Sequence, residues 1–82
     1  MIRLLVVDDQ DLVRQGIVAL LSFESDFKVV AQAVDGDDCL LKVNEFKPDV
    51  VLLDIRMPKR NGLETLREMR MRGDFTPVIL LT

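Results

Sequence analysis

The chain has 82 residues, enough for one small domain, and its 49% hydrophobic and 30% charged residues are typical of a folded globular protein rather than a disordered chain. A net charge of −3 argues against binding of this segment to nucleic acid or to an anionic membrane. The chain has no histidine and a single cysteine, which excludes a classical zinc site, histidine-based catalysis and a disulfide framework.

Four apolar runs predict four short strands, at residues 2–7, 27–34, 50–53 and 78–82. The third run is rich in valine and leucine and lies between two prolines, which favours a strand buried on both faces. It ends at Asp54, so this carboxylate is expected at the carboxyl-terminal tip of the strand. In an open α/β sheet, ligands bind at that end of the strands.

A first helix is expected after the acids at the end of the first strand, with Asp9 or Asp11 as its cap. Gly16 lies inside this helix, and close packing on the sheet is the favoured reason for it. The predicted apolar stripe consists of Leu12, Val13, Ile17, Leu20 and Leu21.

A second helix is expected after the acidic run at residues 35–38, and Pro48 should end it. Asn61 and Gly62 indicate a turn before a third helix, which should stop at Gly73. Apolar residues recur at helical spacing in both helices, at Leu40, Val43 and Phe46 and at Leu63, Leu66 and Met69. Cys39, on the apolar side of the second helix, is expected in the core. The positions expected on a solvated helix face are Arg67, Arg70 and Arg72.

Strands that alternate with helices predict one α/β domain with a doubly wound parallel sheet. The strand order should be 2-1-3-4, with the first helix on one face and the other two helices on the opposite face. The switch point then falls between the first and third strands, which brings Asp8 and Asp9 beside Asp54. Thr82, at the tip of the fourth strand, is the next neighbour.

Three carboxylates in one crevice repel one another, so they require a cation or raised pKa values. Mg²⁺ prefers carboxylate and carbonyl oxygen, and it would also neutralise charge on an incoming phosphoryl group. Asp54 could then act as a nucleophile, and Thr82 could donate a hydrogen bond to a phosphoryl oxygen. A role as a simple helix cap is the favoured reading for Asp11, whereas an ion site is favoured for Asp8, Asp9 and Asp54 together.

The whole chain resembles the receiver domain of two-component response regulators, on the residues Leu5-Val6-Val7-Asp8-Asp9, Val51-Leu52-Leu53-Asp54-Ile55-Arg56-Met57-Pro58, Asn61-Gly62 and Ile79-Leu80-Leu81-Thr82. The resemblance implies a flavodoxin-like fold in which Asp54 accepts phosphate from a sensor histidine kinase. It further implies that Asp8, Asp9, Asp54 and the main-chain carbonyl of Arg56 hold Mg²⁺, and that Thr82 turns toward the phosphoryl group on activation.

Asp9-Gln10-Asp11 and Arg14-Gln15-Gly16 are similar to the LuxR/NarL-type subfamily, whose receivers precede a helix-turn-helix DNA-binding domain. This resemblance implies a cytoplasmic regulator of transcription that is not attached to a membrane and that contacts DNA through an output domain outside this chain. The single unpaired cysteine is compatible with a reducing cytoplasm.

Receivers usually continue with a further helix, strand and helix, and their fifth strand carries a lysine and an aromatic switch residue without a counterpart here. Residues 1–82 are therefore expected to be the N-terminal portion of a receiver, incomplete at its C-terminus. The apolar fourth strand should have one face open or covered by another chain. Such an edge could pair with a second copy, as a homodimer or a domain-swapped dimer.

Two other classes of function, an enzyme and a binding module, are alternatives to a phosphoacceptor domain. A Mg²⁺-dependent phosphohydrolase with an aspartyl nucleophile generally needs an acid two residues after the nucleophile, and that position holds Arg56. A nucleotide-binding module is disfavoured because no glycine-rich loop follows the first strand. A receiver fragment that binds a partner without phosphoryl transfer stays open as an alternative.

Overall fold

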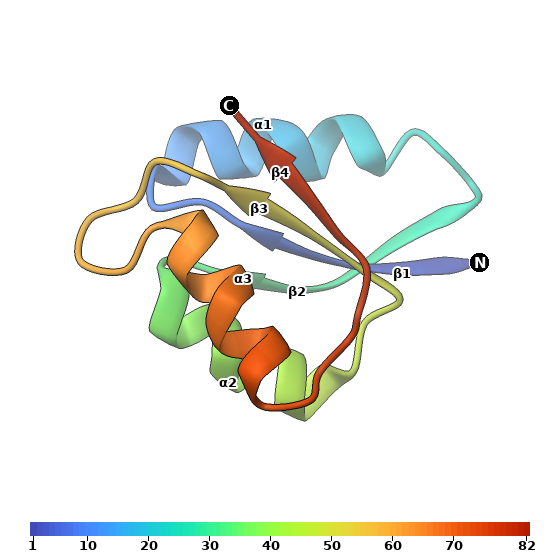
Figure 1. Ribbon diagram of the computed structural model, residues 1–82. Coiled ribbons are helices and arrows are strands. Elements are labelled where there is room, and N and C mark those ends of the chain that lie inside the picture. Colours follow the sequence, from blue (N-terminus) through green and yellow to red (C-terminus); the bar gives the residue numbers. More distant parts are fainter.

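The computed structural model describes residues 1–82 and contains four strands and three helices in strict alternation (Figure 1). Each element lies where the apolar patterns predict it, within a residue or two at most ends. The elements are β1 (Ile2–Val7), α1 (Asp11–Leu21), β2 (Phe27–Ala33), α2 (Gly36–Phe46), β3 (Val50–Asp54), α3 (Gly62–Met71) and β4 (Val78–Leu81).

The four strands form one parallel sheet in the order β2-β1-β3-β4, which confirms the predicted doubly wound topology. Helix α1 covers one face of the sheet, and α2 and α3 lie together on the opposite face (Figure 1). From β1 the chain first adds β2 on one side and then crosses back to add β3 and β4 on the other side. The switch point of the sheet is therefore between β1 and β3. Ligand sites of such sheets lie at this point, beyond the carboxyl ends of the strands.

The core lies between the sheet and the α2–α3 layer. Every second residue of β1 and β3 enters it, as expected for strands whose side chains alternate between two faces. Cys39 is fully buried there, which confirms the expectation that it is a core residue. The fully buried side chains of this cluster are Leu5, Val7, Ala33, Cys39, Val51 and Leu53.

The face under α1 is less well covered, and the predicted stripe of α1 is partly wrong. Leu12 and Leu20 are 87% and 70% exposed. The helix instead turns Arg14, Ile17, Val18 and Leu21 toward the sheet, at the spacing of a helical seam, and Arg14 is buried. Because the buried side of the helix includes a charged residue, a search for apolar residues at helical spacing selects a neighbouring side of α1 instead.

Three smaller expectations on these elements are also corrected. Gly16 has no atom within 4 Å of the position that a Cβ would occupy, so it does not pack against the sheet. The N-cap of α1 is Gln10, which makes no side-chain capping bond, rather than Asp9 or Asp11. In β3, Val51 and Leu53 are fully buried, but Val50 and Leu52 on the α1 side are only half-buried.

The other helix ends follow ordinary chemistry. Asp35 caps α2, because its side chain accepts a hydrogen bond from the Asp38 amide at 2.8 Å. Asn61 and Glu64 form a reciprocal capping box at the start of α3. After α3, Gly73 adopts a φ of +77°, which confirms the expected glycine stop.

The connection from α3 to β4 depends on Arg70, which the sequence placed on a solvated face. Its guanidinium donates to the carbonyl oxygens of Asp74 and Thr76, at 2.8 and 3.0 Å. It also lies 6.0 Å from the centre of the Phe75 ring. Arg70 is therefore a structural residue that holds this turn.

Strand β4 is an edge strand, paired with β3 on one side only. Its outward-facing Ile79 is 53% exposed, so one face of β4 is open within this chain, as expected. None of the three helices has the length and the apolar character that crossing a membrane requires.

At the opposite edge of the sheet, the pairing of β2 with β1 contains a register shift. Leu4 pairs with Val29 and Leu5 pairs with Ala31, so Val30 is an extra residue in β2. Val29 lies beside the end of α1, whereas Ala31 packs against the core on the other face. The shift explains why the alternation of apolar residues in this strand is irregular.

Candidate functional site: an acidic cluster at the carboxyl edge of the sheet

The strand order places three carboxylates at one edge of the sheet. Val7 and Leu53 are paired, so β1 and β3 end side by side. Asp8 and Asp9 follow β1, and Asp54 is the last residue of β3. One carboxylate oxygen from each of the three lies within 4.8 Å of the others. The structure therefore brings together the three acids that the topology predicts as neighbours.

Two of these acids are oriented by the turns that follow them. Asp8 Oδ1 accepts a hydrogen bond from the Gln10 amide at 2.9 Å, and Asp54 Oδ1 accepts one from the Arg56 amide at 3.0 Å. Each carboxylate thus closes a turn with the amide two residues later. No hydrogen bond from the protein occupies Oδ2 of either residue. One oxygen fixes each side chain, and the other is available to a ligand.

The cluster is electrostatically unfavourable by itself. Asp8 is 4% exposed, and its pKa is raised above the usual 3.8, mainly because burial disfavours the charged form. The charges of Asp54 and Asp9 raise this pKa further, whereas the hydrogen bond from the Gln10 amide and the positive charge of Arg14 lower it. A cation between the carboxylates would relieve both their repulsion and the cost of burying Asp8.

The loop after β3 is held close to the cluster by its own backbone. The Ile55 amide donates to the Leu81 carbonyl, and the Gly62 amide donates to the Ile55 carbonyl, both at 3.0 Å. Met57 is buried and anchors the loop from within. Gly62 is buried against the backbone of Asp54, where a Cβ would overlap the Asp54 carbonyl oxygen. The sequence pattern marked Gly62 as a turn residue but not as a close contact of the strand tip.

The other residues singled out in the sequence lie around this cluster. Thr82 follows Leu81, the partner of Asp54 in the sheet, and is therefore at the same edge; its side chain is exposed and makes no hydrogen bond to the acids. The Arg56 side chain is exposed. Asp11 is not the cap of α1 but lies in its first turn, where its carboxylate forms an ion pair with Arg14 at 2.7 Å.

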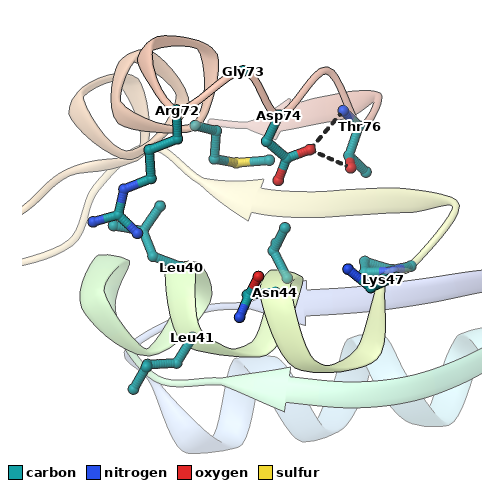
Figure 2. Close-up of a pocket in the computed structure, with 11 residues that line it drawn as sticks. Leu40, Leu41, Asn44, Lys47, Arg72, Gly73, Asp74 and Thr76 are labelled. Carbon is teal, nitrogen blue, oxygen red and sulfur yellow. Dashed lines mark hydrogen bonds between the residues drawn. The ribbon is translucent and has the colours of Figure 1, made fainter.

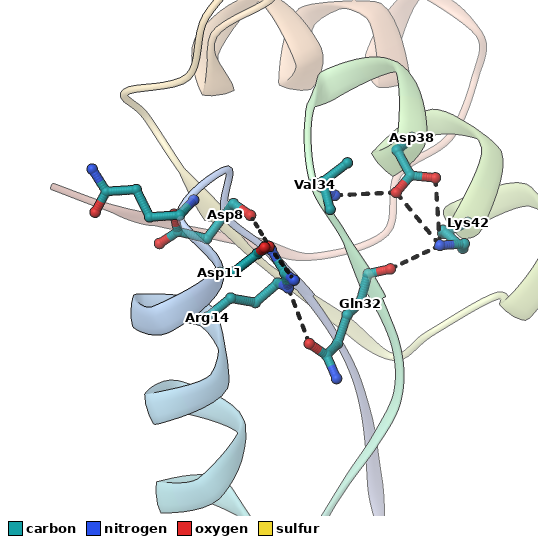
Figure 3. A network of polar contacts seen from close by, with 8 residues as sticks. Asp8, Asp11, Arg14, Gln32, Val34, Asp38 and Lys42 are labelled. Carbon is teal, nitrogen blue, oxygen red and sulfur yellow. Dashed lines mark hydrogen bonds and ion pairs between the residues drawn. The ribbon is translucent and has the colours of Figure 1, made fainter.

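Arg14 lies next to the acidic cluster, and the sequence did not identify it as part of the site. It is 7% exposed and donates to the main-chain carbonyl of Asp8 at 2.9 Å (Figure 3). An arginine beside apolar positions of a helix is usually a surface residue. No pattern in the sequence marks this one as buried, because its acceptors come from three separate elements of the fold.

A groove of about 480 Å³ lies at the other end of the α2–α3 layer (Figure 2). Side chains of α2, among them Leu40 and Asn44, face Arg72 and Asp74 across it. Its one carboxylate, Asp74, already accepts hydrogen bonds from the amide and the hydroxyl of Thr76. The groove therefore lacks the converging, uncompensated acids that distinguish the edge of the sheet.

The acidic cluster suits two kinds of chemistry. Its donors are all hard oxygens, the ligands that Mg²⁺, Ca²⁺ and Mn²⁺ prefer. Asp54 also presents a carboxylate oxygen at a strand tip, where it could act as a nucleophile toward an electrophile held by such an ion.

Comparison with known proteins agrees with this geometry. Residues 4–82 match the family model for the response regulator receiver domain. The response regulator GacA of Pseudomonas viridiflava is 52% identical over all 82 residues, and the match covers 38% of its length. The transcriptional regulatory protein DegU of Brevibacillus brevis is 38% identical over 81 residues, 99% of this chain and 34% of DegU.

Solved structures show the same fold. The response regulator domain of Thermotoga maritima CheB superposes with a TM-score of 0.90 at 40% identity, covering 98% of this chain and 59% of that one. The N-terminal domain of a response regulator receiver protein from Methanoculleus marisnigri gives 0.93 at 33% identity, with 100% and 67% covered.

The present chain thus spans less than two fifths of the two regulators compared in sequence and about three fifths to two thirds of the two solved domains. The family match takes in β1 from its third residue onward and the other three strands completely, and the acids at the carboxyl edge of the sheet fall inside the matched residues. The chain belongs to the response regulator receiver domain family of two-component signalling proteins.

Proposed function

We propose that Asp54 is the phosphoacceptor of this receiver domain and that the phosphoryl group comes from a sensor histidine kinase. The observation that carries this proposal is the convergence of Asp8, Asp9 and Asp54 within 4.8 Å at the switch point of the sheet. Of the three, only Asp54 is itself a strand residue, the last one of β3, whereas Asp8 and Asp9 follow the end of β1. Its Oδ2 is free of protein hydrogen bonds, so it can attack an incoming phosphorus atom.

The same residues fit a divalent cation. Asp8, Asp9 and Asp54, together with the main-chain carbonyl of Arg56, would hold Mg²⁺. Their fit rests on the all-oxygen donor set and on the buried, charge-repelled Asp8, which lacks a compensating cation other than Arg14. When bound, the ion would neutralise negative charge on the phosphoryl oxygens.

In the proposed transfer, Asp54 Oδ2 forms a bond to the phosphorus of the phosphohistidine. The phosphorus–nitrogen bond breaks, its electron pair returns to the imidazole nitrogen, and Asp54 becomes an acyl phosphate. The hydrogen bond from the Arg56 amide to Oδ1 holds the carboxylate while Oδ2 reacts. The Thr82 hydroxyl then donates to a phosphoryl oxygen, and its movement carries the signal away from the site.

This chemistry makes the domain a phosphoryl acceptor rather than an enzyme that turns over. A phosphohydrolase with the same nucleophile would need a general acid two residues later. That residue is Arg56, which cannot donate a proton at neutral pH. Failure of the chain to turn over phosphate esters is the expected result, and steady hydrolysis would favour the hydrolase.

The direct test is incubation of the chain with Mg²⁺ and a small acyl-phosphate donor. Intact-mass spectrometry should show one added phosphoryl group that is stable in acid and lost in base. Asp54→Asn should abolish the adduct. Asp49→Asn, at the opposite end of β3, is the matched control and should keep it. An adduct that persists in Asp54→Asn, or that does not depend on Mg²⁺, would refute the assignment.

For the whole protein, the proposal is a cytoplasmic regulator of transcription. Residues 1–82 would be the N-terminal portion of its receiver domain, and contact with DNA would be made by an output domain outside this chain. The support is the similarity to GacA and DegU, two regulators of which this chain matches only a part. Transfer from a cognate sensor kinase, followed by binding to promoter DNA, is the test in a full-length form.

The open edge of β4 is proposed as the place where a second copy adds, as a homodimer or a domain-swapped dimer. The support is the unpaired edge and the exposed Ile79. Light scattering after size exclusion should report a dimer that Ile79→Lys converts to a monomer. A wild-type chain that is monomeric at high concentration would contradict this part of the proposal.

A further inference from the structure

The buried guanidinium of Arg14 has three different acceptors. It donates to the Asp8 carbonyl at 2.9 Å, to Gln32 Oε1 at 3.0 Å and to Asp11 Oδ1 at 2.7 Å (Figure 3). These acceptors belong to the end of β1, to the edge strand β2 and to the first turn of α1. One rigid, planar fork therefore joins three elements beside the acidic cluster.

The contact with Asp8 acts on the link between two acids of the cluster. The Asp8 carbonyl belongs to the peptide group that connects Asp8 to Asp9, and this group is planar. Rotation about the Cα–C bond of Asp8 would turn that plane and move the Cα of Asp9, and with it the Asp9 carboxylate, relative to Asp54. The Arg14 hydrogen bond holds the plane in one orientation.

The far side of the fork is anchored as well. Gln32, which accepts from Arg14 Nε, also accepts a hydrogen bond from Lys42 Nζ at its main-chain carbonyl, at 2.8 Å. Lys42 forms an ion pair with Asp38 at 3.4 Å, and Asp38 accepts from the Val34 amide at 3.1 Å (Figure 3). The edge strand β2, which positions Arg14 through Gln32, is thus itself held to α2 by these contacts.

We propose that Arg14 is a positioning residue for the cation site: its fork orients the Asp8–Asp9 peptide so that both carboxylates face Asp54. This inference rests on the proposed binding of Mg²⁺ by the cluster. The proposed role depends on the geometry of Arg14 and not on its charge, and these two properties have opposite effects on Mg²⁺ affinity. A positive charge beside the cluster opposes cation binding, so loss of charge alone would tighten Mg²⁺ binding, whereas loss of orientation weakens it.

Mg²⁺ titration by calorimetry and by amide NMR on the 82-residue chain separates these effects. Arg14→Met and Arg14→Lys should both bind Mg²⁺ about 10-fold more weakly than wild type, as is typical for loss of a residue that orients metal ligands. Lysine keeps the charge but not the fork, so it should not rescue binding. Gln32→Leu, a neutral change, should weaken binding to a smaller extent.

The matched control is Arg70→Lys, which removes the guanidinium of another arginine that donates to main-chain carbonyls, in a part of the fold remote from the acids. It should lower stability but leave Mg²⁺ affinity unchanged, because affinity in the folded population does not depend on the free energy of unfolding. NMR spectra of each variant report whether it is folded.

The outcomes distinguish the two proposals. If wild type binds Mg²⁺ and folded Arg14→Met binds it equally or more tightly, the role of Arg14 is refuted while the cation site stands. If Arg14→Met does not fold, an unchanged affinity in Gln32→Leu refutes the role. If wild type binds no Mg²⁺, the proposed cation site fails, and the inference fails with it.

Discussion

Gly62, the first residue of α3, packs directly against the main chain of Asp54. A Cβ at position 62 would overlap the Asp54 carbonyl oxygen and lie 2.9 Å from the Cα of Ile55. Gly62→Ala must therefore push the start of α3 away from the strand tip. We expect it to lower the free energy of unfolding by about 1–3 kcal/mol, the usual cost of overpacking, and to slow phosphorylation of Asp54. Urea denaturation followed by circular dichroism would measure the first effect, and an unchanged midpoint would contradict it.

The same substitution at Gly16 should change the free energy of unfolding in the opposite direction. It lies inside α1, and nothing lies within 4 Å of the position of its missing Cβ. Gly16→Ala should raise the free energy of unfolding by about 0.5–1 kcal/mol, because alanine loses less backbone entropy in a helix. The same denaturation assay serves for both glycines. A loss of stability in Gly16→Ala would show that α1 has a close neighbour at this point.

The buried carboxylate of Asp8 should make the metal-free protein sensitive to pH. Because its pKa is raised in the folded state, the folded chain binds more protons than the unfolded chain just above pH 3.8. Stability contributed by this group is therefore lost as the pH rises through the folded pKa. In metal-free buffer at neutral pH, Asp8→Asn should be more stable than wild type, and its curve of stability against pH should lack this decline.

Mg²⁺ should reverse that order. At a free concentration of 100 times its dissociation constant, a ligand that binds only the folded state adds about 2.7 kcal/mol. Wild type should gain this stabilisation, whereas Asp8→Asn, with one ligand removed, should gain much less. Thermal denaturation with and without Mg²⁺ tests the reversal. Equal stabilisation of both proteins would place the ion elsewhere.

Cys39 offers an internal probe of unfolding. It is fully buried, and burial, together with the charges of Asp38 and Asp74, raises its pKa to about 12. The native thiol should thus react with an alkylating reagent about 1,000-fold more slowly than in denaturant, since only the opened chain reacts. Stability should also fall, relative to Cys39→Ala, as the pH rises above about 9. Fast labelling of the native protein would contradict the burial.

Much of this fold could be predicted from the sequence because its signals are local. The apolar runs of β1 and β3 and the helical spacing between them define parallel strands, and the acids at their ends follow from where the runs stop. Proximity of Asp8 to Asp54 needs only the additional rule that the sheet is doubly wound. Even the capping box at Asn61 has a local signal, in the glutamate three residues later.

The features that could not be predicted depend on how the folded chain places acceptor atoms around a side chain, which no apolar pattern records. Arg14 is buried because Asp8, Asp11 and Gln32 all accept from it, and no pattern within α1 indicates this. Arg70 is structural because the following turn exposes two carbonyl oxygens to it. Both arginines carry a positive charge, and residue type alone assigns such residues to the surface.

The shifted register of β2 makes the two edges of the sheet unequal. A strand with an extra residue at Val30 is bent and twisted there, which makes a poor template for another strand, whereas β4 has a regular, apolar edge. A sheet in which only one edge can pair with another strand can add only one further copy. Association between copies of this chain should therefore stop at a pair and not extend into a filament.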